Sequence, residues 1–317
     1  MSIKVIVTGG AGFIGSNLVK ELLKKEYKVT VLDNLLTGNL ENLEEFKSNP
    51  NFKFIKHDII EPIDIPCDKI FHLACPASPP AYQAYPIETW ETSVLGTRNI
   101  IKLAEKYKAK MLYTSTSEIY GDPTVSPQNE EYWGNVNCRG IRSCYDEGKR
   151  AAETLCFEYL KKGVWIRTAR IFNTYGENMD PNDGRVISNF IVQALLGKDL
   201  TVYGNGEQTR SFSYVSDTVN GLLKLIDCDY EGPINIGNPE EFKIIDLAQI
   251  IKQKINDKIN IINLPPVLDD PTKRKPDISK AKKYINWEPI FKLEQGLIPT
   301  IEYFKKKVNE PNFKFIF

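Results

Sequence analysis

The stretch "IKVIVTGGAGFIG", Ile3 to Gly15, decides the fold that this sequence predicts. Its first part, "IKVIVT" (3–8), is a short β-branched run and predicts a buried parallel strand. Glycines follow at once, and "FIGSNLVKELLKK" (13–25) then has apolar residues at helical spacing and lysines at its end. A strand that turns through glycines directly into a helix is the context that a dinucleotide-binding site requires.

The three glycines have the spacing G-x-x-G-x-x-G. We expect Gly9 to make a tight turn, Gly12 to let the backbone approach a pyrophosphate, and Gly15 to let the helix pack on the strand. The start of the helix, at Phe13 and Ile14, then offers free N–H groups to the phosphates.

An acid follows at the expected place. Asp33 ends "YKVTVLD" (27–33), the second predicted strand, within reach of an adenosine ribose. A carboxylate there repels a 2′-phosphate, so it predicts NAD rather than NADP as the cofactor. Asp58 is a candidate adenine contact or a plain strand-end residue. The remaining candidates for cofactor binding, at or after strand ends, are Asn34, Ile59 and Leu73.

Strands alternate with helices through the first half of the chain, which predicts a Rossmann-like, doubly wound parallel sheet covered on both faces. Beyond about residue 173 the pattern loosens. We expect an NAD-binding Rossmann domain at 1–173 and, at 174–317, mainly a smaller mixed α/β substrate-binding region with some segments returning to the first domain. The predicted strands are 3–8, 27–33, 52–58, 69–74, 110–116 and 164–171, and the helices are 13–25, 87–108 and 143–162.

Composition narrows the class of protein. The 317 residues are 42% hydrophobic, and 41 basic residues balance 41 acidic ones, which argues against binding to nucleic acid or to an anionic membrane. We expect no signal peptide and no membrane span. Six cysteines without C-x-x-C spacing predict reduced thiols in the cytoplasm. The histidines, His57 and His72, form no ligand cluster, so no metal site is predicted.

Within "SCYDEGKR" (143–150), Tyr145 and Lys149 are spaced to share one face of a helix. A phenol has a pKa near ~10 and is a poor base at neutral pH. A cation beside it favours the phenolate and lowers that pKa. The pair is therefore a candidate base and its activating neighbour, although an isolated Y-x-x-x-K is usually an ordinary surface pair.

These residues resemble the extended short-chain dehydrogenase/reductase family of nucleotide-sugar enzymes and, within it, the UDP-glucuronate decarboxylases. The likeness runs from Ile3 to about Lys306. There are two departures: "NCRGIRS" (137–143) replaces a more proline-rich stretch, and Glu177-Asn178 follows Gly176 where a proline is usual. The narrower motifs are "HLACPASPP", "STSEIYGDP", "YWGNVN", "CYDEGKRAAE", "FNTYG", "DGRVISNF", "LTVYGNGEQTRSF", "NIGNPEEF" and "RKPDI".

The resemblance implies a redox-neutral decarboxylation of UDP-glucuronate to UDP-xylose and CO2. Oxidation at C4 by NAD makes the acid a β-keto acid, whose electrons form an enolate when CO2 leaves, and the ketone is then reduced again. By the same resemblance, Tyr145 is the base, Lys149 lowers its pKa and holds the nicotinamide ribose, and Thr116 hydrogen-bonds the C4 oxygen. Arg274 grips the carboxylate, and Glu118, together with Ser117, assists decarboxylation or protonates C5.

The resemblance also places the nucleotide sugar. Asn173, Arg185 and Arg210 are candidates for the diphosphate, and Tyr203 for the uracil pocket. Ser78, Pro80 and Tyr82 of the proline-rich loop are candidates for the sugar pocket or for loop rigidity alone. In this family the helices at 87–108 and 143–162 usually form a homodimer interface.

Three other functions compete with this one. A UDP-sugar 4-epimerase uses the same oxidation, and only "CPASPP", Glu118 and "RKPDI" argue against it. A 4,6-dehydratase needs an acid after the threonine, where this chain has Ser117, a poor acid. A catalytically silent NAD sensor would be expected to lack Tyr145 or Lys149.

Overall fold

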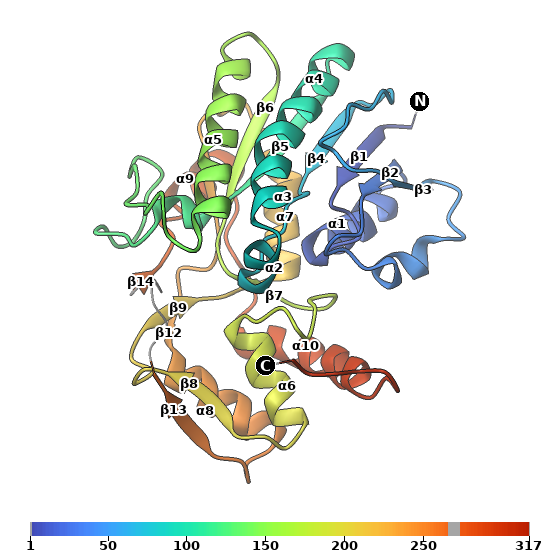
Figure 1. Cartoon of the computed structure of the whole chain (residues 1–317). Coiled ribbons are helices and arrows are strands. Elements are labelled where there is room, and N and C mark those ends of the chain that lie inside the picture. Colours follow the sequence, from blue (N-terminus) through green and yellow to red (C-terminus); the bar gives the residue numbers. More distant parts are fainter. Residues whose placement is uncertain (1, 266–272, 317) are drawn as a thin grey trace.

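A parallel sheet is the framework of the computed structural model, which describes residues 2–265 and 273–316. Its strands have the order β11-β6-β5-β4-β1-β2-β3, and every neighbouring pair is parallel (Figure 1). The strand order reverses between β1 and β4, where ligands bind in open α/β sheets. The predicted Rossmann-like fold is confirmed. The strands are β1 (Lys4–Thr8), β2 (Lys28–Asp33), β3 (Phe52–Lys56), β4 (Lys69–His72), β5 (Lys110–Thr116), β6 (Ile166–Ile171) and β11 (Ile234–Ile236).

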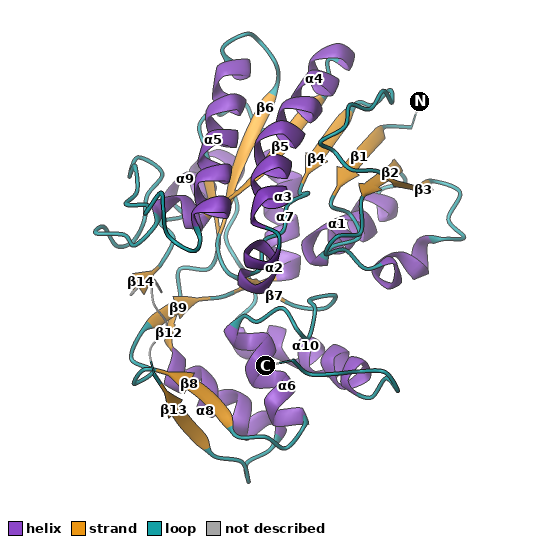
Figure 2. Ribbon diagram, viewed as in Figure 1, coloured by secondary structure: helices purple, strands orange, loops and turns teal. Residues whose placement is uncertain are grey.

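Helices cover both faces of this sheet (Figure 2). On one face α1 (Phe13–Lys24) packs beside α7 (Val215–Leu225). On the other face α5 (Ser143–Leu160) packs against α3 (Pro86–Glu91) and α4 (Thr97–Tyr107). Because both faces are covered, β1 is buried at every position from Val5 to Thr8 and β5 from Met111 to Thr116.

The predicted helix at 87–108 is interrupted in the structure. A π-helical turn, Thr92–Gly96, separates α3 from α4. Such turns arise from an extra residue within a helix and are frequent at functional sites. A Cβ atom added at Gly96 would lie 2.6 Å from Cδ1 of Ile59, so glycine lets this turn approach the end of the third strand.

The smaller region lies beyond the carboxyl ends of the main strands (Figure 1). Strand β11 belongs to the large sheet although it follows residue 173, so the chain returns there after leaving it. The division at residue 173 remains a prediction. The elements outside the main framework are α2 (Pro79–Ala84), α6 (Val186–Leu195), α8 (Ile244–Ile255), α9 (Ser279–Ile285), α10 (Leu293–Val308), the 3-10 helices Leu40–Phe46 and Ser117–Tyr120, and the strands β7 (Thr174–Tyr175), β8 (Leu200–Tyr203), β9 (Thr209–Ser211), β10 (Ser213–Tyr214), β12 (Glu241–Lys243), β13 (Ile261–Leu264) and β14 (Lys273–Arg274).

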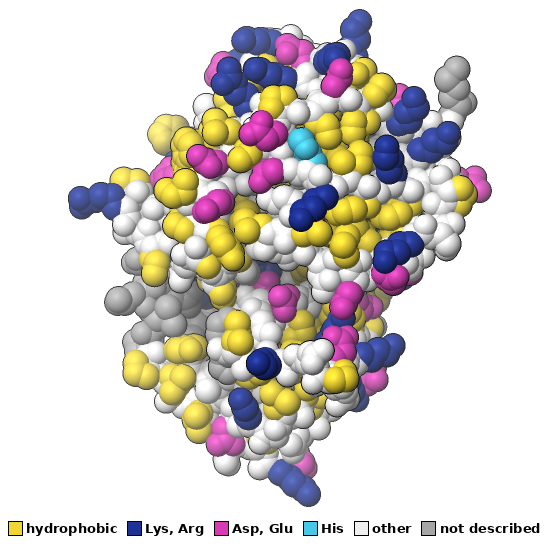
Figure 3. Space-filling view, turned by 45° about the vertical axis from the view of Figure 1, so that its right-hand side comes forward, with side chains coloured by type: hydrophobic (Ala, Val, Ile, Leu, Met, Phe, Trp, Pro, Cys, Tyr) yellow, Lys and Arg dark blue, Asp and Glu magenta, His cyan; other side chains and the backbone are white. Residues whose placement is uncertain are grey.

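The surface carries charges of both signs. Figure 3 shows acidic and basic side chains spread over one face, with hydrophobic side chains between them on its upper half. Over residues 2–265 and 273–316, we find no helix whose length and apolar character together would let it cross a bilayer.

Candidate active site

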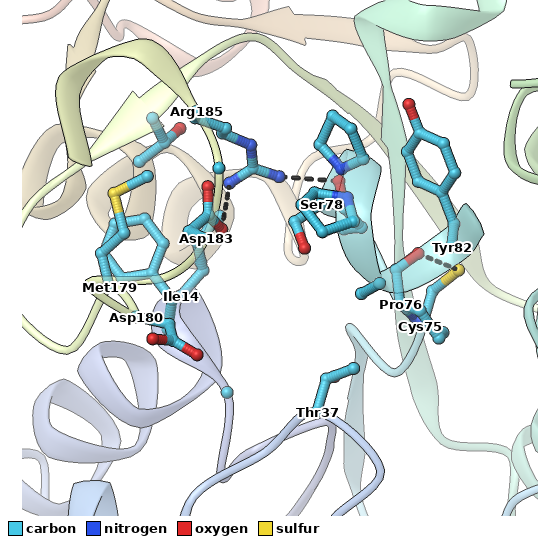
Figure 4. A pocket seen from close by; sticks show the side chains of 18 of the residues that line it. Ile14, Thr37, Cys75, Pro76, Ser78, Tyr82, Met179, Asp180, Asp183 and Arg185 are labelled. Carbon is cyan, nitrogen blue, oxygen red and sulfur yellow. Dashed lines mark hydrogen bonds and ion pairs between the residues drawn. The ribbon is translucent and has the colours of Figure 1, made fainter. Parts of the chain in front are cut away.

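A continuous pocket of about 1860 Å³ follows the carboxyl ends of the main strands. Sites for one drug-sized ligand have volumes of about 300–1,000 Å³, so this pocket has room for more than one such ligand. Figure 4 shows the part where the proline-rich loop faces the loop that carries Arg185. Every site residue expected from the sequence lines the pocket: Gly9, Gly12, Phe13, Ile14, Gly15, Asp33, Asn34, Asp58, Ile59, Leu73, Ser78, Pro80, Tyr82, Thr116, Ser117, Glu118, Tyr145, Lys149, Asn173, Arg185, Tyr203, Arg210 and Arg274.

The glycine turn has the geometry of a phosphate-binding loop. A Cβ atom added at Gly15 would lie 2.1 Å from the carbonyl oxygen of Gly9, so helix and strand meet there only because residue 15 is glycine. Gly12 precedes α1, and no side chain caps this helix. The N–H groups of its first turn, at Phe13 and Ile14, therefore face the pocket as an anion site, which fits a dinucleotide pyrophosphate.

Backbone hydrogen bonds hold the Asp33 carboxylate in place. The N–H of Ala11 donates to Oδ2 at 3.0 Å, and the N–H of Leu35 donates to Oδ1 at 2.9 Å. Burial raises the pKa of Asp33, and these two hydrogen bonds lower it. Each carboxylate oxygen accepts more than one hydrogen bond, so Asp33 keeps acceptor capacity for ribose hydroxyls.

The Asp58 carboxylate accepts two hydrogen bonds just beyond the end of the third strand. Its Oδ2 accepts a hydrogen bond from Nδ2 of Asn34 at 2.9 Å, and its Oδ1 accepts one from the N–H of Ile60 at 3.1 Å. These bonds join two strand ends beside the nucleotide part of the pocket. Both of the roles considered for Asp58, adenine contact and strand-end residue, are compatible with this position.

Tyr145 and Lys149 lie on the buried face of α5. The Lys149 ammonium donates to the carbonyl of Thr114 at 2.9 Å and lies 5.9 Å from the centroid of the Tyr145 ring. Thr116 hydrogen-bonds the Tyr145 side chain. Burial raises the pKa of Tyr145, whereas the hydrogen bond from Thr116 lowers it. The lowered pKa of Tyr145 expected from the sequence is therefore not found in the folded protein, where burial is the largest influence on Tyr145 and also lowers the pKa of Lys149.

The proline-rich loop places an aromatic ring against Tyr145. Two prolines begin α2 after Ser78, and Tyr82 in this helix stacks on Tyr145 with ring centroids 5.2 Å apart. The Tyr82 hydroxyl is buried and has no hydrogen-bond partner among the described residues. Figure 4 shows Tyr82 and Ser78 on the same wall of the pocket.

Glu118 is bound by two arginines from distant parts of the chain. Its Oε1 pairs with Arg274 and its Oε2 with Arg142. Arg274 is only 3% exposed, and it also contacts Oγ of Ser117 at 3.4 Å and the carbonyl of Gly121 at 3.3 Å. Burial lowers the pKa of Arg274 to about 10, so its guanidinium remains charged at neutral pH.

Sequence reasoning missed Arg142 as a site residue, although it lies in "NCRGIRS", one of the two departures. Arg142 precedes the first residue of α5 and lies 3.9 Å from the carboxylate of Asp146. Asp146 is buried, and burial raises its pKa to about 7. The available signal was the position of Arg142, close before Tyr145 at the start of the same helix.

The other departure, Glu177-Asn178, links its loop to α1 and to Tyr214. The Tyr214 hydroxyl donates to both oxygens of the Glu177 carboxylate, at 2.8 and 3.0 Å. Nδ2 of Asn178 donates to Oγ of Ser16 in α1 at 3.0 Å, and Asn17 donates to the Glu177 carbonyl at 2.9 Å. The residues that stand in place of the usual proline thus attach this loop to the first helix.

The candidates for nucleotide binding lie farther along the pocket. Arg185 donates to the carbonyl of Ala77 at 2.8 Å and pairs with Asp183 at 3.4 Å (Figure 4). Arg210, in β9, is in register with Arg274 in β14. Asn173 follows β6, and Tyr203 is 45% exposed at the end of β8.

Within residues 2–265 and 273–316, no three His, Cys, Asp or Glu side chains gather closely enough to hold a metal ion. The described cysteines are all free thiols.

Fold and site together define a class of protein. The model of the NAD dependent epimerase/dehydratase family matches residues 5–237, and the chain belongs to this family. The resemblance seen in the sequence is confirmed more narrowly, because relatives at about half identity over nearly the whole chain are UDP-glucuronic acid decarboxylases.

Two of these relatives are a fish and a plant protein. UDP-glucuronic acid decarboxylase 1 of Danio rerio is 52% identical over 315 residues, which are 99% of this chain and 75% of the relative. UDP-glucuronic acid decarboxylase 3 of Arabidopsis thaliana is 53% identical over 312 residues, which are 98% of this chain and 91% of the relative.

Solved structures of the same fold include two epimerases. The UDP-glucose 4-epimerase of Thermotoga maritima with UDP-glucose is 30% identical, with a TM-score of 0.87, and the match covers 97% of this chain and 100% of that chain. The UDP-glucuronic acid 4-epimerase of Bacillus cereus, in complex with UDP-glucuronic acid and NAD, is 28% identical with a TM-score of 0.86. That match covers 96% of this chain and 99% of the epimerase.

Proposed function

We propose that this protein catalyses the NAD-dependent decarboxylation of UDP-glucuronate to UDP-xylose and CO2. The observation that carries the proposal is that two groups of residues line one pocket. The first is the Tyr145–Thr116 pair, and the second is the Glu118 carboxylate, bound between two arginines. The first group suits oxidation of a hydroxyl. The second provides cations for a substrate carboxylate. The names of the relatives support the same reaction.

A hexuronate does not lose CO2 readily, because the electrons left on C5 have no acceptor. A ketone at C4 provides that acceptor, since the electrons then form an enolate. The chemistry that NAD supplies when bound is reversible hydride transfer at C4, which creates this ketone and later removes it.

Tyr145 takes the proton of the C4 hydroxyl, and Thr116 hydrogen-bonds the same oxygen and stabilises the enolate. Tyr145 must be a phenolate to take this proton; burial opposes that form, and the hydrogen bond from Thr116 favours it. Lys149, held by the carbonyl of Thr114, orients the nicotinamide ribose and supplies a positive charge 5.9 Å from the Tyr145 ring.

Arg274 orients the carboxylate so that the bond from C5 to it stands perpendicular to the ketone plane, where its electrons reach the carbonyl. Glu118, with Ser117 beside it, takes a proton from water and delivers it to C5 after CO2 has left. Their contacts with the Arg274 guanidinium place both residues at this end of the pocket.

The remaining pocket residues bind the two nucleotides. The residues fit NAD: the uncapped start of α1 faces the pyrophosphate, and the buried Asp33 carboxylate takes the ribose hydroxyls. Asn173, Arg185 and Arg210 bind the diphosphate of the sugar nucleotide, and Tyr203 lines the uracil site.

Epimerases share this fold, so inversion at C4 is the second candidate reaction. Proton NMR of the purified protein with UDP-glucuronate and NAD separates the two, with absorbance at the NADH band followed alongside. A UDP-pentose with a C5 methylene and no lasting NADH is the expected result. A C4-inverted acid would instead show an epimerase, and unchanged substrate would overturn both reactions.

We further propose a homodimer in the cytoplasm. Helices α3 and α5 pack side by side, and their region exposes large apolar side chains. A second copy of the same surface would bury them, because a C2 interface uses one patch twice. The free thiols suit a reducing compartment. The exposed side chains are Ile87 (67%), Trp90 (42%), Leu95 (41%) and Phe157 (58%).

A further inference from the structure

The carboxylate of Glu118 lies between two guanidinium groups that the fold brings together. Arg142 is 24 residues away in the sequence, and Arg274 is 156 residues away. Glu118 offers one oxygen to each arginine. Two charge-assisted hydrogen bonds of this kind are strong and specific for a planar carboxylate, whichever molecule carries that carboxylate.

This cluster lies at the place where the reacting sugar must bind. Thr116, which hydrogen-bonds Tyr145, is followed directly by Ser117 and Glu118 in a short 3-10 helix. In a hexuronate the carboxyl group is attached to C5, the neighbour of C4. If Tyr145 and Thr116 contact the C4 oxygen, the substrate carboxylate therefore arrives beside Glu118 and its two arginines.

The charges at the cluster favour an additional anion. Two arginines face one glutamate, and the carboxylate of Asp146 lies 3.9 Å from Arg142. Burial raises the pKa of Asp146 to about 7, so it carries only part of a negative charge at neutral pH. The buried hydroxyl of Tyr82, which has no partner within residues 2–265 and 273–316, lines the same pocket and is a further donor for an oxygen atom.

We propose that Arg142 is a second carboxylate-binding residue beside Arg274, and that Glu118 holds both arginines until the carboxylate of the substrate replaces it. The exchange is of one carboxylate for another, so the buried Arg274 and the partly buried Arg142 are never left without a partner, which would be costly. The exchange also releases the Glu118 carboxylate next to C5, where it can take a proton from water and pass that proton to C5, as the proposed reaction requires. This inference rests on the proposed function for the identity of the acid.

Binding of two sugar nucleotides to the NADH-loaded protein, which cannot oxidise the C4 hydroxyl and so turns neither ligand over, tests the inference. UDP-glucuronate carries the carboxylate, and UDP-glucose has a neutral CH2OH group at the same carbon. We expect Arg142→Met to raise the dissociation constant of UDP-glucuronate, measured by calorimetry, by roughly 10- to 100-fold. The dissociation constant of UDP-glucose should change less than about twofold, since no charge pair is lost with it.

Three further variants complete the test. Arg139→Met, a change at an exposed arginine of the same loop, should alter neither constant. Arg142→Lys should recover part of the preference, because lysine keeps the charge but not the planar fork. Glu118→Gln should tighten binding of UDP-glucuronate and leave UDP-glucose unchanged, because the competing carboxylate is gone. Unchanged NAD affinity and circular dichroism show that each variant is folded.

Equal weakening of both ligands by Arg142→Met would make Arg142 a structural residue, and weaker UDP-glucuronate binding by Glu118→Gln would exclude the exchange. If Arg142→Met does not fold, the Arg142→Lys and Glu118→Gln results decide alone. If the wild-type protein prefers UDP-glucuronate but Arg142→Met keeps that preference, only this inference fails. If the wild-type protein shows no preference and forms no UDP-xylose, the proposed function itself fails.

Discussion

The ring of Tyr82 stacks on the ring of Tyr145, with their planes 10° from parallel and their centroids 5.2 Å apart. Tyr82 lies in α2, within the proline-rich stretch after β4, and Tyr145 lies in α5. This contact therefore joins the proposed sugar-binding side of the pocket to the proposed base. Loss of the stack would free the Tyr145 ring to turn away from Thr116.

Two variants of Tyr82 distinguish the contribution of its ring from that of its hydroxyl. Tyr82→Phe keeps the stack and removes a buried hydroxyl that has no partner in the described part of the chain, so we expect stability in urea to stay level or rise by about 1 kcal/mol. Tyr82→Ala removes the ring and should cost about 3–5 kcal/mol. A Phe variant that loses as much stability as the Ala variant would show that the hydroxyl is satisfied in the folded protein. A higher KM for UDP-glucuronate in Tyr82→Phe would place the hydroxyl on the substrate.

Tyr145→Phe removes only the oxygen that is proposed to take the C4 proton. We expect turnover to fall by roughly 10²–10⁴-fold, the range for loss of a general base, while the affinity for NAD, measured by fluorescence quenching, stays within a factor of about two. Turnover like that of the wild type would remove Tyr145 from the mechanism.

Asp33→Ala tests the ribose assignment. Its carboxylate is held by two backbone N–H groups, and the change removes an acceptor for the ribose hydroxyls. Affinity for NAD should fall by roughly 10-fold or more, whereas affinity for NADP, which the carboxylate repels, should fall much less or improve. Equal losses for the two cofactors would contradict the assignment.

Asp146 predicts a particular dependence of stability on pH. Its pKa is about 7 in the folded protein, against about 3.9 in an unfolded chain, so the folded state binds more protons between these values. Stability therefore falls as pH rises from about 4 to 7, because the slope follows the protons bound in the unfolded state minus those bound in the folded state.

The matched variant is Asp146→Asn, which cannot titrate. Between pH 5 and pH 8 the wild type should lose on the order of 2–3 kcal/mol relative to the variant in urea denaturation. Burial, the largest cause of the raised pKa of Asp146, is lost when the chain unfolds. Parallel pH profiles for the two proteins would show that Asp146 is ionised throughout.

The apolar surface over α3 and α5 predicts the oligomeric state. Ile87 and Phe157 are 67% and 58% exposed, and we expect the double change Ile87→Glu, Phe157→Glu to convert a dimer to a monomer in light scattering. The matched control changes Ile290 and Ile298, 76% and 60% exposed, which lie outside α3 and α5. A wild-type protein that is monomeric at high concentration would contradict the proposed homodimer.

The sequence alone determined what depends on neighbours in the chain. The run from Ile3 to Gly15 specified strand, turn and helix, because periodicity and glycine spacing act within a few residues. The spacing of Tyr145 and Lys149 placed both on one face of α5 for the same reason. The predicted helix at 87–108 was right in extent, but its π-helical turn depends on the contact of Gly96 with Ile59.

Only the tertiary structure decided which charges meet. Glu118, Arg142 and Arg274 come from a 3-10 helix, a loop and a short strand, and no local pattern links them. The same holds for the pKa of Tyr145, which the sequence suggested to be lowered by Lys149 and which burial raises in the folded protein. Burial and long-range pairing depend on the packing of the whole chain, so their balance appears only once the sheet and the smaller region have closed around the pocket.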